Sequence, residues 1–227
     1  MSRVVTLLLA FIAVSGCVPA FAVDGVVLIN QASVTAAGGF PFSIFLPGSY
    51  KLSGNLEVPA ETDGIDIAAA GVTLDLNGFS IRGPINCQGV ACTQHTNDTR
   101  GVFFTRGRTV IRNGNITGFA NGILGEGSGT VEDIHISDTA SFGIFTTETI
   151  VKHVEISGNG GLGLACGECV VVENHVEANR KGGVNLGGGT FSGNIVFSNG
   201  DNVNFANAFI AATVVSAHNN ACNDSGC

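Results

Sequence analysis

A repeat of twenty residues limits how this chain can fold more than any other feature of its sequence. When the chain is aligned with itself at this spacing, residues of similar type fall into the same columns. The first column holds Ile111, Val131, Val151, Val171, Phe191 and Ala211. Three positions later, a second column holds Gly114, Ile134, Val154, Asn174, Asn194 and Val214. A third column holds Ile116, Ile136, Ile156, Val176, Val196 and Ser216.

Two further patterns extend this repeat. One column reads Phe119, Thr139, Asn159, Asn179, Asn199 and Asn219. A glycine followed by an apolar residue recurs at Gly122-Ile123, Gly143-Ile144, Gly163-Leu164 and Gly183-Val184. An earlier stretch, VTLDLNGFSIRGP, matches the repeat through Leu76, Phe79 and Ile81. Because a buried amide is costly without a partner, the shared phase of the asparagines predicts a ladder in which each amide bonds to the next.

The repeat predicts an all-β fold, a single-stranded right-handed parallel β-helix with coils of about 20 residues. Each repeat contains short β-type segments and turn residues, and none contains a helical stretch. One coil cannot bury its apolar side alone, but coils stacked about 4.8 Å apart bury a continuous core. Leucine-rich repeats have similar periods, but this chain lacks their Leu-x-x-Leu-x-Leu consensus and helical return.

The other parts of the chain are predicted to surround this β-helix, which covers residues 61–221. An insertion loop at 84–99 separates two coils. Residues 23–60 lack the repeat and are rich in apolar residues, so we expect them to form an N-terminal cap over the open end of the stack. Residues 222–227 are expected to form a short, disulfide-closed tail.

Residues 1–22 are predicted to be a signal peptide. Arg3 precedes an apolar run that is too short to span a bilayer, and Ala20-Phe21-Ala22 has the small-x-small pattern of a cleavage site. The expected location is therefore periplasmic or secreted. An alternative is an outer-membrane lipoprotein, because Val14-Ser15-Gly16-Cys17 also fits a bacterial lipobox with Cys17 as the lipidated residue.

The cysteines agree with export. Apart from Cys17, they form close pairs that are predicted to be disulfides: Cys87–Cys92, Cys166–Cys169 and Cys222–Cys227. The sequence CGEC could instead be a redox site, but a strand pattern follows it where such a site needs a helix N-terminus. A zinc site is disfavoured because the pairs are spread along the chain.

Several phrases of the chain resemble a known family. VDGVVLINQA, FPFSIFLPGSYKLSGNL, GVTLDLNGFSIRGP and the C-terminal cysteine pair resemble exported proteobacterial right-handed β-helix repeat proteins. More distantly, the fold is similar to the pectin-lyase-like superfamily. The resemblance covers essentially the whole mature chain and implies this fold and an export signal, with the mature protein beginning near VDG. It does not imply an established reaction.

Composition and motifs favour a non-catalytic exported scaffold, or a protein that binds a glycan or surface polymer. A formal charge of -8 makes nucleic acid an unsuitable partner, and the mature chain has no expected transmembrane segment. The alternative is a polysaccharide-active enzyme, either a lyase, an epimerase or a hydrolase. Against it, Asp75, Asp133 and Asp138 fall in different columns. Tyr50 is the only Tyr or Trp, and most Phe residues are expected in the core or the cap.

The best candidate site is a polar stripe formed by His135, Glu155 and His175. These residues share a column between inward apolar positions, so they are expected to point outward on adjacent coils. His153 and Glu173 lie two residues earlier, near a turn. No cofactor is expected, although the stripe could hold a divalent metal such as zinc or copper, or act as an acid and base pair. The competing interpretation is a solvated face that neutralises its own charge.

Overall fold

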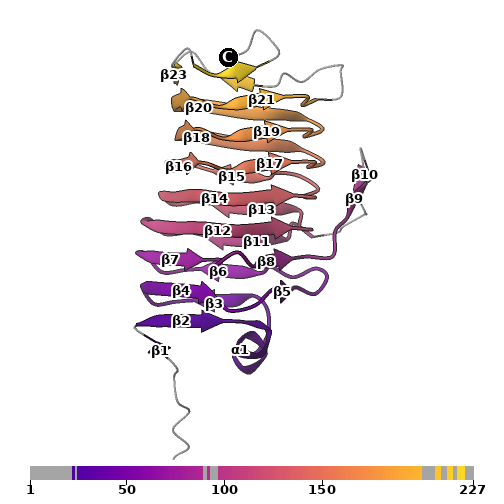
Figure 1. Cartoon of the computed structure of the whole chain (residues 1–227). Helices are drawn as coiled ribbons and strands as arrows, with labels where there is room; N and C mark the ends of the chain where they lie inside the picture. Colours follow the sequence, from indigo (N-terminus) through magenta and orange to yellow (C-terminus); the bar gives the residue numbers. More distant parts are fainter. Residues whose placement is uncertain are drawn as a thin grey trace, which may run out of the picture.

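The computed structural model describes residues 22–23, 25–88, 91–92, 97–200, 208–210, 214–216 and 219–222. These residues form a stack of parallel coils, with the N-terminal segment at one end and the C-terminal strands at the other (Figure 1). Parallel crossover connections are right-handed in almost all proteins. The strand pairing confirms the predicted single-stranded parallel β-helix, and this rule makes its expected hand right-handed.

Three parallel ladders of strands run along the stack. The first ladder consists of β2 (Val26–Ile29), β4 (Gly48–Leu52), β7 (Val72–Asp75), β12 (Thr109–Thr117), β14 (Gly129–Ser137), β16 (Thr149–Lys152), β18 (Leu162–Val172), β20 (Gly182–Ser192) and β23 (Val214–Ser216). In β12 and β14, the strand continues around a corner into the second ladder, and β18 and β20 begin in the third.

The second and third ladders complete each coil. The second contains β5 (Leu56–Glu57), β8 (Ser80–Arg82), β17 (Glu155–Ser157), β19 (His175–Glu177), β21 (Ile195–Phe197) and β24 (Ala221–Cys222). The third contains β3 (Phe42–Ile44), β6 (Ile65–Ile67), β11 (Arg100–Phe104), β13 (Asn121–Gly125), β15 (Ile144–Thr146) and β22 (Ala208–Ile210).

The predicted columns stack in register through most of the chain. Ile111, Val131, Val151, Val171 and Phe191 pair in succession, and all five are fully buried. The Gly-apolar pairs stack as well, with Ile123, Ile144, Leu164 and Val184 in one column. The glycine is needed because a methyl group at Gly143 would lie 2.5 Å from the carbonyl oxygen of Gly163.

The predicted register is wrong in the last coil. Phe191 pairs with Ser216 instead of Ala211, and Val196 pairs with Cys222 instead of Ser216. Val214 pairs with Gly189 and so does not follow Asn194. Residues 191 and 216 are 25 positions apart, so this coil is longer than the repeat, and a fixed spacing of twenty misplaces every later position.

The predicted asparagine ladder is present at one corner. The Asn159 Oδ1 accepts from the Thr139 backbone N–H at 2.9 Å, and the Asn159 Nδ2 donates to Asn179 Oδ1 at 2.7 Å. The Asn179 Nδ2 then donates to Asn199 Oδ1 at 2.9 Å. Asn219 does not continue this ladder, because its Oδ1 accepts from the backbone N–H of Gly193.

A second asparagine ladder occupies the other corner. Asn174 donates to Asn194 at 3.0 Å, and Asn194 donates to Asn220 at 3.1 Å. A left-handed backbone precedes the ladder asparagines Asn159, Asn174, Asn179, Asn194 and Asn199, as in Glu173 (φ 55°) and Ala178 (φ 53°). This conformation turns the chain sharply and directs the following amide inward, where it satisfies backbone groups that the turn leaves unpaired.

The segment predicted as a cap contributes to both the coils and their end. Strands β2 to β5 belong to the ladders, so the parallel pairing starts before residue 61. The short helix α1 (Gln31–Ala36) lies at this end of the stack (Figure 1) and buries Val34 against the core. A capping box starts this helix, because Asn30 and Ser33 exchange hydrogen bonds of 2.8 and 3.0 Å.

Two short pairings in the described residues are antiparallel. β1 (Ala22–Val23) pairs with β2, and the insertion loop contains the hairpin of β9 (Cys87–Gln88) and β10 (Ala91–Cys92). No helix in the described parts of the chain is long and apolar enough to cross a membrane. The predicted signal peptide and its alternative lipidation site at Cys17 lie outside the described residues, apart from Ala22.

Replacing Asn179 with alanine should destabilise the fold by about 2 kcal/mol or more, since the Ile156 carbonyl and two ladder amides would lose their partner. Urea denaturation followed by circular dichroism measures the change. The control is Asn185→Ala, at an exposed position of β20, which should change stability by less than about 0.5 kcal/mol. Equal effects in the two variants would contradict the ladder's role.

Candidate functional site

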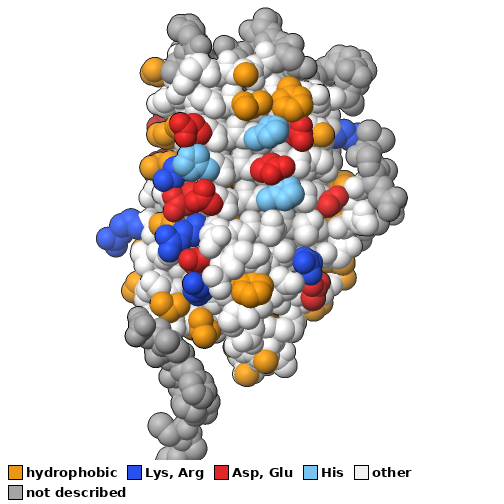
Figure 2. Space-filling view, viewed as in Figure 1, with side chains coloured by type: hydrophobic (Ala, Val, Ile, Leu, Met, Phe, Trp, Pro, Cys, Tyr) orange, Lys and Arg blue, Asp and Glu red, His pale blue; other side chains and the backbone are white. Residues whose placement is uncertain are grey.

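The structure brings the predicted polar stripe together. His135 pairs with Glu155 and Glu155 pairs with His175, so the three residues occupy one outward column of the second ladder. Figure 2 shows this column on the surface, with an acidic side chain between two histidines. Asn115 precedes the stripe and the exposed Ile195 follows it, so the ionisable part of the column is limited to these three residues.

The side chains of the stripe do not converge on one point. The His135 Nε2 lies 3.4 Å from Ser157 Oγ, and the His175 Nε2 lies 3.6 Å from Glu177 Oε2. The ring of His175 packs against Phe197, with ring centroids 5.3 Å apart. Within the described part of the chain, no group of three or more His, Cys, Asp or Glu side chains is arranged to hold a metal ion. The side chains of the stripe therefore point to separate partners and do not form such a group.

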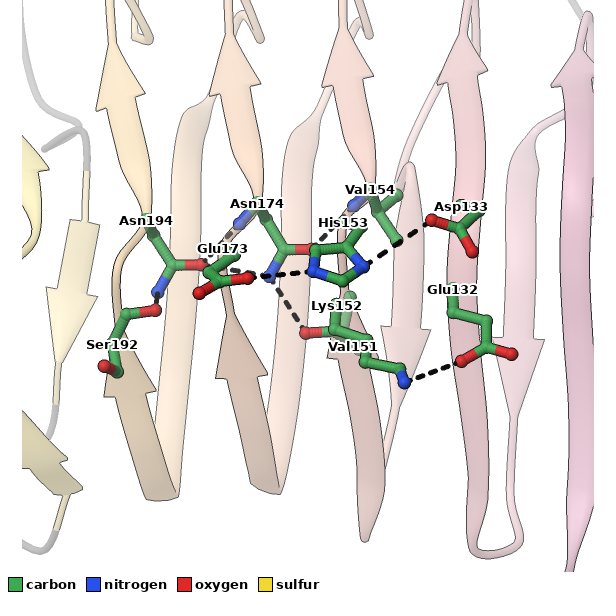
Figure 3. A network of polar contacts seen from close by, with 10 residues as sticks. All are labelled: Glu132, Asp133, Val151, Lys152, His153, Val154, Glu173, Asn174, Ser192 and Asn194. Carbon is green, nitrogen blue, oxygen red and sulfur yellow. Dashed lines mark hydrogen bonds and ion pairs between the residues drawn. The ribbon is translucent and has the colours of Figure 1, made fainter.

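A tighter arrangement lies at the neighbouring corner, where Asp133, His153 and Glu173 form what we term the corner triad (Figure 3). The His153 Nε2 is 2.8 Å from Glu173 Oε2, and its Nδ1 is 3.6 Å from Asp133 Oδ1. All three residues have left-handed backbones with φ between 53° and 55°. The corner geometry thus places these side chains on the outside of the turn, a direction that the sequence pattern left open.

The polar stripe and the corner triad border one shallow groove of about 360 Å³, which we term the polar groove. Its lining includes Asp133, His153, His135 and Glu155, together with the amides of Asn113 and Asn115. Gly114 also lines the groove, at the inward position where later coils carry the buried Ile134 and Val154. Carboxylates and imidazoles are the side-chain types that most often serve as general acids and bases.

Basic side chains beside this surface are already paired. The Lys152 Nζ lies 2.8 Å from Glu132 Oε2, and this hydrogen bond raises the pKa of Lys152. Arg112 pairs with Asp75 at 3.3 Å one rung further toward the N-terminus. Opposite charges therefore alternate along the column, and each partly cancels the next.

A second candidate surface lies on the third ladder, where an outward column forms what we term the outer row. Successive strand pairs align Asp66, Phe103, Leu124, Phe145, Ala165 and Asn185. Phe145 is 42% exposed and its ring lies 5.1 Å from that of Phe142. Ala165 is small and lies between the larger Phe145 and Asn185, so the row is hollowed at this rung.

This hollow is a groove of about 260 Å³, which we term the outer-row groove. Phe145, Ala165 and Asn185 line it, and its remaining lining residues are Thr146, Thr147, Cys166, Gly167 and Gly187. The lining is therefore largely apolar, with an amide and hydroxyl groups beside an aromatic ring. Ligand sites commonly combine apolar contact with a few polar groups in this way.

The prediction that Phe residues are explained by the core or the cap is wrong for Phe145. Phe103, Leu124 and Phe145 are 21 residues apart, whereas Phe145, Ala165 and Asn185 are 20 apart. Alignment at a constant twenty residues separates members of the row into different columns. The spacing between successive Gly-apolar pairs changes from 21 residues to 20. This change in spacing was the sequence signal that could have corrected the alignment.

The N-terminal end of the outer row is charged but internally paired. Arg100 forms an ion pair with Asp63 at 2.5 Å, and its guanidinium lies 4.1 Å from the ring centroid of Phe103. Burial raises the pKa of Asp66, and the neighbouring carboxylate of Asp63 adds to this effect. The Asp66 Oδ1 is buried and has no hydrogen-bond partner among the described residues.

The structure forms two of the expected disulfides, Cys87–Cys92 and Cys166–Cys169. Cys166 and Cys169 are both buried in β18, away from any helix, which is unlike a redox site. Cys222 is also disulfide-bonded, and its predicted partner Cys227 lies outside the described residues.

No protein-family model matches the chain, and no curated protein matches it either. Among solved structures, the chain is similar to the crystal structure of the Dettilon tailspike protein at 15% identity and a TM-score of 0.42. The match covers 81% of this chain and 49% of that one, so this chain spans about half the tailspike's length. The fold assignment accordingly rests on the strand pairing, and the family resemblance noted in the sequence remains an expectation.

Replacing Asp66 with asparagine should stabilise the protein at neutral pH. Because burial raises the pKa of Asp66, its contribution to stability is present in acid and is lost as the pH rises through the folded-state pKa. The gain in melting temperature should therefore be seen at neutral pH and disappear in acid. Thermal denaturation over a pH series tests this, with the exposed Glu126→Gln as control. A gain that is independent of pH would contradict the explanation.

Proposed function

We propose that this protein is an exported, non-catalytic β-helix scaffold that binds a glycan or another surface polymer through its outer row. The observation that carries the proposal is the outer-row groove, where the exposed Phe145 ring lies beside Asn185 and Thr147. A sugar has apolar C–H faces and polar edges. An aromatic ring beside amide and hydroxyl groups complements both.

The length of the row supports a polymer as ligand. From Phe103 to Asn185 the row spans four rung steps, which is roughly 19 Å at about 4.8 Å per step. This span exceeds one sugar ring, so an extended chain could contact several rungs. A regular stack of coils presents such a surface without requiring mobile loops.

Export is part of the proposal and has its own support. The predicted signal peptide and the disulfides are both compatible with an oxidising compartment outside the cytoplasm.

The test of binding is affinity electrophoresis of the mature protein in gels that contain individual polysaccharides. We expect retardation by at least one polymer, and we expect Phe145→Ala to weaken binding at least fivefold, because the aromatic contact is lost. Ile150→Ala is a matched control, since Ile150 is also 42% exposed and lies on another face of the same coil. Equal weakening by both variants, or no retardation by any polymer, would contradict the proposal.

A polysaccharide-active enzyme is the second candidate function, and the corner triad is the observation that favours it. Because His153 lies between two carboxylates beside the polar groove, it could transfer protons to a bound polymer. If so, wild-type protein should shorten a polysaccharide or epimerise its sugars, and His153→Asn should reduce that rate at least 100-fold without loss of folding. Ile195→Ala, beyond the end of the polar stripe, should leave the rate unchanged. No change in polymer length or in sugar stereochemistry with any substrate would reject this candidate.

A further inference from the structure

We infer that the outer-row groove selects an uncharged polysaccharide and discriminates against polymers that carry carboxylate or sulfate groups. This inference rests on the proposed function and names the class of ligand for the same site. It is drawn from the charges around the groove and from the ion pair between Arg100 and Asp63.

The lining of the groove carries no charged side chain. Its residues are aromatic, aliphatic, hydroxyl-bearing or amide-bearing, together with glycine and a disulfide-bonded cysteine. An anionic group brought into this hollow would lose part of its hydration and would gain no cationic partner. Desolvating an unpaired charge costs several kcal/mol, so even partial burial would disfavour an acidic polymer.

Arg100, a cation at the N-terminal end of the outer row, does not supply the missing charge. Arg100 lies beside Phe103, two rungs from Phe145, and its guanidinium is paired with Asp63. Asp66 follows on the next rung, so this end of the row contains two carboxyl groups and one guanidinium. An acidic polymer long enough to reach from the groove to Arg100 would also approach these carboxyl groups.

Two acidic residues beside the groove act in the same direction. Glu148 and Glu168 are both exposed and lie one residue beyond the lining residues Thr147 and Gly167. The formal charge of the whole chain is -8, so the average field repels anions. A neutral polymer has no charge to desolvate and is not repelled by these carboxylates. Its sugar faces can still contact Phe145, and its hydroxyl groups can bond to Asn185.

The test compares pairs of polymers that share a backbone and differ in charge. Suitable pairs are polygalacturonate with its carboxyl-reduced form, polymannuronate with mannan, and oxidised with unmodified soluble cellulose. Affinity electrophoresis and calorimetry would measure binding of wild type, Phe145→Ala, Asn185→Lys and the control Ile150→Ala. Asn185 is exposed, so a lysine there can add a cation at the groove without disturbing the core.

We expect the neutral member of any bound pair to bind at least tenfold more tightly than the acidic member, with Phe145→Ala weakening the neutral polymer. We also expect less than a twofold change in affinity as salt is raised, and a several-fold gain for the acidic member in Asn185→Lys. Tighter binding of the acidic member that still depends on Phe145 would overturn the inference and leave the proposed function standing. If no polymer binds, or if Phe145→Ala binds as wild type does, both fail.

Discussion

The hydrogen bonding of each coil to the next is the constraint on which the rest of this structure depends. Backbone bonds align the strands, and the two asparagine ladders fix the corners, where backbone groups would otherwise be unpaired. Side chains alternate between inside and outside, so a slip of one residue would place polar residues in the core. Because the corners prevent such a slip, residues that are twenty positions apart in sequence become neighbours in space.

Every candidate surface of this protein is a consequence of that alignment. The polar stripe, the corner triad and the outer row are all columns in which one residue per coil points outward. Because the backbone of one coil repeats that of the next, the chemistry of each column depends on the size and charge of its side chains. The corner triad forms because left-handed residues recur at the same position, and the outer-row groove forms because Ala165 follows Phe145.

Sequence periodicity was sufficient to predict the fold and the inward columns between Ile111 and Phe191, because a parallel stack repeats its buried positions. It also placed His135, Glu155 and His175 in one column. It failed where coil length changes, as at Ser216 in the last coil and at Phe145 in the outer row. Nor could it show that the two histidines of the stripe turn toward Ser157 and Glu177, because rotamers depend on all neighbouring side chains.

The two grooves differ in how their side chains are stabilised, and this difference bears on function. The polar groove gathers carboxylates and imidazoles that contact one another, as His153 contacts Glu173 at 2.8 Å. Such polar contacts suit a solvated surface even when no ligand is bound. The outer-row groove has no comparable internal compensation, since Phe145 leaves 42% of its surface exposed and gains nothing from water. The Phe145 ring packs against Phe142, and covering its exposed part would remove further apolar surface from water, so this groove is the more informative of the two surfaces.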